Sequence, residues 1–360
     1  MARMTPYDAL PKSAFWRSGV VEASPFDLQE LYSKKFDILP ETKIATGGSC
    51  FAQLLSRRLR AHGYSFLDVE PAPAWLPREQ HLKYGFSTYS ARYGNIYTIP
   101  QLRQLAQEAA GTFEPQNICW QRDGKFYDAL RPAVEPDGLE SEAELRLHRQ
   151  FHVDKVRVLF ASMDLFIFTL GLTEAWRHKK SGTVYPTAPG VFAGEFDDAE
   201  YEFVNFSFGD IERAFDEFLS ALKAIRGDRP LPKVLLTVSP VPMTATASGR
   251  HVLQANTYTK SLLRTFAGQL AAQHGFIDYF PSYEIVVNQA ARGVFYENNL
   301  RSIRTEGVDT VMKVFFASHA PAAANVVPLP EAEKSSATAA PRQKLDAEIQ
   351  CEEAILEAFA

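Results

Sequence analysis

The chain has 360 residues, of which 46% are hydrophobic and 12% aromatic, which allows a substantial core and excludes global disorder. The formal net charge of -5 gives no basic footprint for nucleic acid. Three scattered cysteines, Cys50, Cys119 and Cys351, argue against a disulfide framework or a thiolate zinc site. The first residues form no hydrophobic signal region and no apolar run reaches membrane-spanning length, so we expect a cytoplasmic protein without a membrane span.

Residues 1–40 contain four prolines with aromatic residues between them, which indicates an irregular N-terminal arm. Residues 44–63 then predict a short buried strand, a two-glycine turn and a helix. Ser49 lies where the strand gives way to the helix. Unpaired N–H groups and the positive end of the helix dipole stabilise negative charge there, so a nucleophilic hydroxyl fits this position. An ordinary N-cap serine fits it equally well, and both interpretations stay open.

The following segments alternate between expected strands and helices. Residues 64–69 alternate like a second strand, and a helix is expected at 101–110. Residues 111–142 are irregular and rich in proline and glycine, which indicates an excursion. A helix at 142–162 leads into 164–170, whose nearly continuous apolar run suits a central parallel strand.

The second half of the chain continues this alternation after another excursion at 182–208. Asp210 is expected to cap a strongly periodic helix that ends at Gly227. The remaining expected elements are strands at 233–239 and 276–280 and helices at 252–273 and 307–316. Strands separated by helices predict a three-layer, flavodoxin-like α/β domain with a mostly parallel sheet over residues 41–317. Ligands of such sheets bind beyond the carboxyl ends of the strands.

The composition changes abruptly after residue 317. Alanine, proline, serine and threonine dominate residues 318–342, which indicates a flexible linker. Residues 343–360 recover a helical pattern with an apolar and an acidic side. This pattern is typical either of a frayed terminal helix or of an amphipathic segment that binds a protein partner or another copy of the chain.

Five short motifs in order carry a resemblance to a known family. The first is Gly-Ser-Cys-Phe-Ala at 48–52, and the others lie at 91–98, 169–176, 237–242 and 279–284. These motifs resemble the GSCFA family, which looks like a branch of the SGNH/GDSL hydrolase superfamily. The resemblance covers most of the chain from about residue 40 to residue 316 and implies an SGNH-like α/β fold.

The SGNH resemblance implies that Ser49 is the nucleophile and that its own N–H is one oxyanion donor. Gly94 and Asn95 supply the further glycine and asparagine donors in one motif. Thr173 stands where a later asparagine is expected, and its hydroxyl donates over a shorter reach. An arginine can bind an anionic group and a tryptophan face can pack on a sugar ring. The predicted substrate-binding residues are Arg92, Trp176 and Arg301.

The general base is the main departure from the SGNH pattern. The resemblance implies an Asp-x-x-His pair near the last core helix, but Asp309 is followed at this spacing by Met312. A thioether takes no proton near neutral pH. His251 and Glu174 are the predicted replacements, either with His251 as base and Glu174 as its orienter or with Glu174 as a carboxylate base. The ordinary interpretation of His251, as a polar residue that starts a helix, stays open.

Two other sites are disfavoured. Cys50 is a rival nucleophile, but one residue past Ser49 it should turn into the core. His148 and His152 stand one helical turn apart, yet no third ligand is evident, so we expect no metal. No phosphate loop or dinucleotide fingerprint is present, so we expect no cofactor.

These features predict a serine-dependent esterase or O-acyltransferase that acts on a carbohydrate-type substrate. Its expected partners are a glycan or small molecule and an acyl donor, and surface polysaccharide biosynthesis in bacteria is one setting for such a reaction. The alternative is a non-catalytic module that binds a glycan or a protein through the same cleft.

Overall fold

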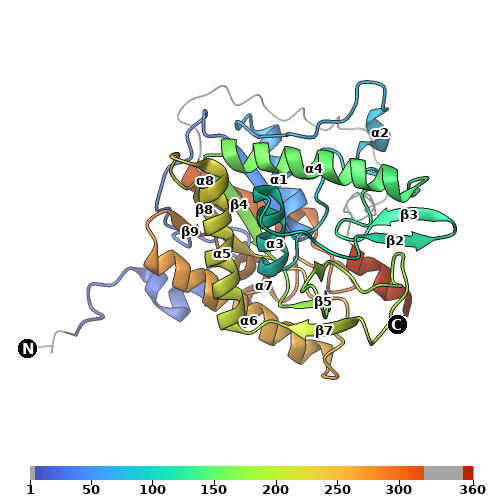
Figure 1. The fold of residues 1–360 in the computed structure, drawn as a ribbon. Helices are drawn as coiled ribbons and strands as arrows, with labels where there is room; N and C mark the ends of the chain where they lie inside the picture. The colour runs from blue at the N-terminus through green and yellow to red at the C-terminus, as the bar shows by residue number, and fades with distance from the viewer. Residues whose placement is uncertain (1–4, 320–351, 360) are drawn as a thin grey trace, which may run out of the picture.

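The computed structural model describes residues 5–319 and 352–359. At its centre lies a four-stranded parallel sheet in the order β1-β4-β8-β9 (Figure 1). The strands are β1 (Ile44–Gly48), β4 (Leu165–Leu170), β8 (Lys233–Val238) and β9 (Ile277–Tyr279). Every residue of β1, β4 and β9 is buried, as in parallel sheets that are covered on both faces. The predicted mostly parallel sheet is confirmed.

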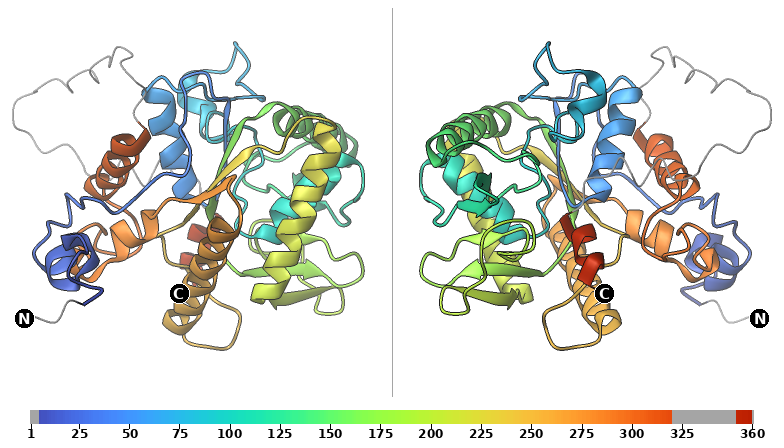
Figure 2. Two further views of the ribbon diagram at one scale, coloured as in Figure 1. Left: turned by 90° about the vertical axis from the view of Figure 1, so that its left-hand side faces the viewer. Right: turned by 90° about the vertical axis from the view of Figure 1, so that its right-hand side faces the viewer.

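Helices cover both faces of this sheet, which makes three layers (Figure 2). Along β4 the side chains alternate, so that Phe166 and Phe168 enter one apolar cluster and Leu165 and Ile167 enter the other. The first cluster is closed by α3 (Ile99–Ala110), α4 (Glu142–Ser162), α5 (Phe208–Arg226) and α6 (Val252–Gln273). The second is closed by α1 (Phe51–Ala61), α7 (Ser282–Val287) and α8 (Thr305–His319). The expected α/β fold with helices on both faces is therefore confirmed.

Both excursions contain small antiparallel structures that the sequence did not predict. The first holds a hairpin of β2 (Cys119–Arg122) and β3 (Lys125–Asp128). In the second, β6 (Val184–Tyr185) and β7 (Tyr201–Asn205) pair with β5 (Glu174–His178). The short helices elsewhere are η1 (Lys12–Ala14), η2 (Arg17–Val21), α2 (Arg78–His81), η3 (Gln289–Ala291) and η6 (Glu352–Phe359).

Two expectations about individual elements are wrong. Residues 64–69 form only one bridge, between Phe66 and Ile44, because the chain then leaves β1 and the Val69 N–H donates to Ser90. Asp210 does not cap α5. Ser207 is the N-cap, and Asp210 is the third helical residue of a capping box that pairs both side chains with backbone N–H groups.

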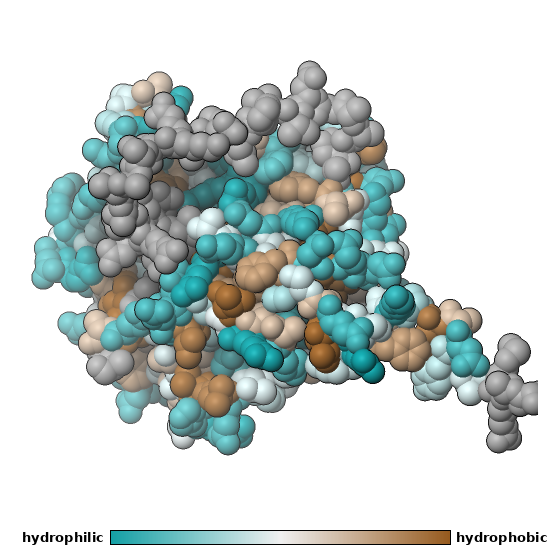
Figure 3. All heavy atoms as spheres, turned by 180° about the vertical axis from the view of Figure 1, so that it is seen from behind, coloured by the Kyte–Doolittle hydropathy of each residue, from teal (hydrophilic) through white to brown (hydrophobic). Residues whose placement is uncertain are grey.

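The described part of the N-terminal arm packs on the α7–α8 layer through aromatic side chains. Phe26 stacks edge-on against Phe295 with ring centres 5.1 Å apart, and Tyr32 stacks in the same way against Phe280 at 5.2 Å. Figure 3 shows the molecule from behind, where apolar side chains are interspersed with hydrophilic ones.

The remaining boundary predictions fall mainly on residues outside the described ranges. Of the predicted linker at 318–342 only the first two residues are described, and they belong to α8. Of the predicted helix at 343–360, the described part is η6, a 3₁₀-helix. Among the helices of residues 5–319 and 352–359, none has the length and hydropathy needed to span a bilayer.

Candidate functional site

Ser49 lies at the sharp turn between β1 and α1. Gly48 adopts a φ of +127° just before it, and any Cβ at Gly48 would collide with the carbonyl oxygen of Thr169 at the end of β4. Only glycine lets β1 and β4 approach so closely here. The Ser49 N–H, predicted as an oxyanion donor, donates to that same Thr169 oxygen at 3.1 Å. It continues the ladder between the two strands.

The Ser49 hydroxyl is buried and unpaired. The residue is 4% exposed, and within residues 5–319 and 352–359 its Oγ has no hydrogen-bond partner. The cap position of α1 is Cys50 and carries no side-chain cap hydrogen bond, so the Ser49 hydroxyl does not cap this helix. A buried hydroxyl without a partner costs about 1–3 kcal/mol. Such groups call for an explanation, and a catalytic role is one of those known.

The predicted donor loop lies against the Ser49 turn. The Ile96 N–H donates to the Gly48 oxygen at 2.9 Å. Asn95 Oδ1 accepts hydrogen bonds from the Tyr89 hydroxyl at 2.5 Å and from Gln53 Nε2 at 3.1 Å. The Tyr89 oxygen also lies 3.1 Å from the Ser49 carbonyl oxygen. These contacts hold the Asn95 side chain in one orientation beside the turn that carries Ser49.

The segment after β4 closes the other side of the turn. A Cβ on Gly171 would lie 2.9 Å from Ser49 Cβ and 3.2 Å from the Tyr97 carbonyl oxygen, so only glycine lets this segment pack so closely against Ser49. Lys260 of α6 is 1% exposed, and its Nζ donates to the Gly171 oxygen at 2.9 Å. This buried ammonium was missed, because one lysine in an amphipathic helix normally indicates a solvent-facing position. No signal in the sequence distinguishes Lys260 from the other lysines.

The Thr173 hydroxyl is hydrogen-bonded to residues of α6 and β7. It donates to Asn205 Oδ1 at 2.7 Å and lies 2.8 Å from the Thr259 hydroxyl. Both hydroxyls are fully buried.

Glu174 lines a pocket of about 230 Å³ beside this region. Burial raises the pKa of its carboxyl group, and the hydrogen bond from Thr246 offsets this only in part. The Thr246 hydroxyl lies 2.8 Å and 2.9 Å from the two carboxylate oxygens. A carboxyl group with a raised pKa at a pocket wall is suited to accept a proton near neutral pH. The pocket is otherwise mostly apolar and includes Leu172, Ala175, Trp176, Val191, Phe203 and Met243.

His251 is an N-cap residue in this structure. His251 is exposed at the start of α6, where its Nδ1 accepts a hydrogen bond from the Leu253 N–H at 3.1 Å. This is the ordinary role of a polar residue at a helix start.

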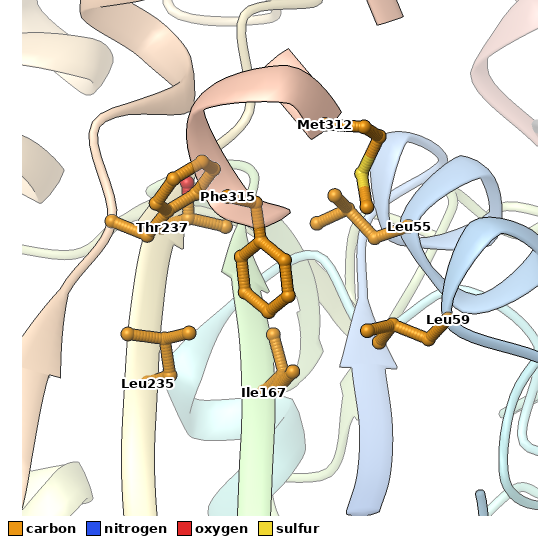
Figure 4. Close-up of a pocket in the computed structure, with 8 residues that line it drawn as sticks. Leu55, Leu59, Ile167, Leu235, Thr237, Met312 and Phe315 are labelled. Atoms are coloured by element: carbon orange, nitrogen blue, oxygen red, sulfur yellow. The ribbon is translucent and has the colours of Figure 1, made fainter. Parts of the chain in front are cut away.

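Met312 lies in the apolar core. Figure 4 shows it directed from α8 toward Leu55 of α1, with Phe315 above Ile167 of the sheet. The cavity between these side chains measures only about 10 Å³. Asp309 forms an ion pair with Arg58 of α1. The position that the SGNH resemblance assigns to the histidine therefore stabilises helix packing in this chain.

The predicted substrate-binding residues lie in three different surroundings. Arg92 donates to the Glu135 carboxylate at 2.7 Å and to the Tyr84 carbonyl oxygen, also at 2.7 Å. Its charge is therefore paired with a carboxylate of the first excursion. Trp176 lines the pocket. Arg301 Nη1 lies 3.8 Å from Glu357 Oε1 of η6.

Two further tryptophans, Trp75 and Trp120, also have ring faces that could pack on a sugar, and they differ in access. Trp75 is 80% exposed, whereas Trp120 is buried and its ring packs on Tyr185 with centres 5.3 Å apart. Trp120 therefore offers no face to a sugar ring in this structure.

The structure also shows where the residues of the disfavoured thiol and metal sites lie. Cys50 packs in a cluster with Leu172 and Met243, as its helical position predicts. His152 is fully buried, with Nδ1 2.7 Å from Glu70 Oε2. Within residues 5–319 and 352–359, no group of three His, Cys, Asp or Glu side chains is placed to hold a metal ion.

Comparison with known proteins identifies one family. A family model described as the GSCFA family matches residues 43–315, a range that includes all five motifs. No curated protein and no solved structure shows a significant match.

Proposed function

The chain belongs to the GSCFA family, and on that premise we propose that it is a serine-dependent esterase or O-acyltransferase with Ser49 as its nucleophile. One observation carries the proposal: the Ser49 hydroxyl is buried and has no hydrogen-bond partner among the residues that the structure describes. The start of α1 also places this hydroxyl near the positive end of a helix dipole, which favours an attacking oxyanion.

In the proposed reaction, Ser49 Oγ attacks the carbonyl carbon of an ester and passes its proton to Glu174. The alcohol leaves with the proton that Glu174 took up. Water or an acceptor hydroxyl then gives a proton to Glu174 and attacks the acyl-serine, and Ser49 leaves with that proton. The Asn95 amide and the Lys260 ammonium supply positive charge to the developing oxyanion. Both lie next to the segments that enclose Ser49, since Asn95 is fixed by Tyr89 and Lys260 donates to Gly171.

The pocket suggests which part of the substrate binds where. Its wall is mostly apolar and contains Trp176 and Met243, which suits an acyl chain. A carbohydrate-type acceptor stays part of the proposal, with Trp176 as an aromatic side chain that shares the pocket wall with Glu174. A cytoplasmic location and a place in surface polysaccharide biosynthesis stay predictions from the sequence.

Labelling with a fluorophosphonate probe tests the nucleophile. We expect the wild type to be labelled, the adduct to map to Ser49, and the Ser49→Ala variant to be unlabelled. Cys50→Ala is the matched control, because it changes the neighbouring residue and removes the rival thiol. Loss of labelling in Cys50→Ala with retention in Ser49→Ala would refute Ser49 as the nucleophile.

Met312 favours a second candidate function, a non-catalytic module that binds a glycan or a protein through this cleft. Met312 is buried where α8 packs on α1, and its thioether is no base at the position that the SGNH resemblance assigns to one. A wild type that stays unlabelled, yet binds an acylated oligosaccharide more tightly than its Trp176→Ala variant does, supports the binding module.

A further inference from the structure

The C-terminal segment of the chain lies in the wall of the candidate pocket. Its described part is η6 (Glu352–Phe359), the red helix near the C label in Figure 2 (right). Leu356 of this helix lines the pocket together with Leu172, Trp176 and Met243. The segment therefore places an aliphatic side chain among the residues that the proposed function gives to the acyl group.

A second contact fixes the position of the same segment. The Glu357 carboxylate lies 3.8 Å from Arg301 Nη1. The Arg301 side chain is 14% exposed and the Glu357 side chain is 54% exposed, so the pair joins a mostly covered arginine to a carboxylate at the surface. An apolar residue in a pocket and an acidic residue on a mostly buried arginine make two different contacts from adjacent positions. These two contacts together favour binding of this segment over binding of a segment that is merely apolar.

The pocket adjoins the Ser49 turn. Leu172 follows Gly171, and Gly171 packs closely against Ser49. Leu172 and Met243 also pack with Cys50, the neighbour of Ser49. A group that occupies the pocket therefore lies next to the side chains that surround the hydroxyl, and Ser49 itself is closed from solvent in this arrangement.

We propose that residues 352–359 are a built-in ligand of this pocket, which binds there in place of a substrate acyl group and must leave before substrate enters. The docking stands on the Leu356 and Glu357 contacts alone. The competition with substrate rests on the proposed function. The chain therefore carries its own competitive inhibitor.

Hydrogen exchange on the full-length chain tests the docking without any activity. We expect the Leu356→Asp variant to exchange its amides at 172–176 and 352–359 about tenfold faster than the wild type, because a charge replaces a half-buried apolar side chain in the pocket wall. Leu147→Asp is the matched control, since Leu147 is 72% exposed on α4 and its variant should exchange as the wild type does. Equal exchange in the wild type and in Leu356→Asp would overturn the proposal. Protection of 352–359 that grows with protein concentration would also overturn it, since the occupant would then belong to another copy.

The rate of fluorophosphonate labelling at Ser49 tests the competition. We expect Leu356→Asp to be labelled several-fold faster than the wild type and Leu147→Asp. A synthetic peptide of residues 352–360, added to Leu356→Asp, should slow the labelling again. Labelling that is equally fast in all three proteins, while exchange shows the segment released, overturns the inhibitory role. If exchange shows docking and none of the proteins is labelled, the docking holds and the esterase proposal fails.

Discussion

Gly48 sets the backbone on which the candidate nucleophile stands. Its φ is +127°, and a Cβ there would collide with the Thr169 carbonyl oxygen at the end of β4, which leaves no space for a side chain. We predict that Gly48→Ala lowers the free energy of unfolding by more than about 2 kcal/mol, because β1 must move away from Thr169. Urea denaturation of the full-length chain measures this change.

Gly63→Ala is the control for the Gly48 prediction. Gly63 also has a positive φ, +74°, but a Cβ there would meet no atom within 4 Å. The expected loss is therefore limited to backbone strain, about 1 kcal/mol. Similar losses in the two variants would show that the close approach of β1 and β4 contributes nothing.

The two candidate bases, Glu174 and His251, lead to different expected results. If Glu174 takes the Ser49 proton, Glu174→Gln should slow fluorophosphonate labelling at least about 100-fold. His251→Ala should lose only a helix cap, which costs about 1 kcal/mol of stability and leaves the labelling rate nearly unchanged. The opposite result, a large rate loss in His251→Ala alone, would make His251 the base.

Thr246→Val refines the test of Glu174. The hydroxyl of Thr246 lowers the pKa of the Glu174 carboxyl group against the effect of burial. Its removal should therefore raise that pKa further, and the rise of the labelling rate with pH should move to higher pH. A pH profile identical to that of the wild type would argue against Glu174 as the proton acceptor.

At the scale of elements, the β2–β3 hairpin is tied to the helices by a buried charge network. Asp128 at the end of β3 lies 2.8 Å from Arg131 and 3.4 Å from Arg149 of α4, and Arg149 pairs in turn with Glu108 of α3. Burial raises the pKa of Asp128, but Arg149 and Arg131 outweigh this and hold it below its usual range. The first excursion is thus anchored by charge as well as by apolar contacts.

We predict that Asp128→Asn lowers the free energy of unfolding by about 3–5 kcal/mol, because it leaves a buried arginine charge uncompensated. Glu142→Gln is the control, since its pair with Arg146 lies on the surface of α4 and should contribute less than about 1 kcal/mol. Thermal or urea unfolding measures both variants. An equally small effect of the two would show that the network does not stabilise the hairpin.

The elements also differ in how well the sequence predicted them. The long helices and the β4 strand were predicted because their apolar periodicity is local and strong. The strands β5, β6 and β7 were missed, since they are short and pair within a segment rich in loops. Residues 64–69 show the reverse error. They have an alternating pattern, but the chain turns toward Ser90 after one bridge to β1.

At the scale of the whole molecule, two buried histidines make stability depend on pH. Burial lowers the pKa of His319 to about 4, and Lys34 adds to this. Burial and Arg131 lower the pKa of His152 as well, and Glu70 compensates only in part. Below the ordinary histidine pKa of about 6.5, the unfolded chain takes up protons that the folded chain does not. Stability is therefore expected to fall as the pH falls from about 6.5 toward 4.

Urea denaturation at a series of pH values between 7 and 4 checks this expectation. His319→Gln keeps a polar partner for Tyr32, whose hydroxyl lies 3.0 Å from His319 Nε2, but it removes one titrating group. Its stability should therefore change less with pH than that of the wild type. A wild type whose stability is constant over this range would contradict the buried, uncharged state of both histidines.

By itself, the sequence determined the parallel sheet with its covering helices and the place of Ser49 between a strand and a helix. Hydrophobic period, turn glycines and helix ends are properties of neighbouring residues, so they can be read along the chain. Only the tertiary structure decided what surrounds the Ser49 hydroxyl. Gly171, Lys260 and Leu356 come from distant parts of the chain, and packing, which no local pattern encodes, determines which side chains meet.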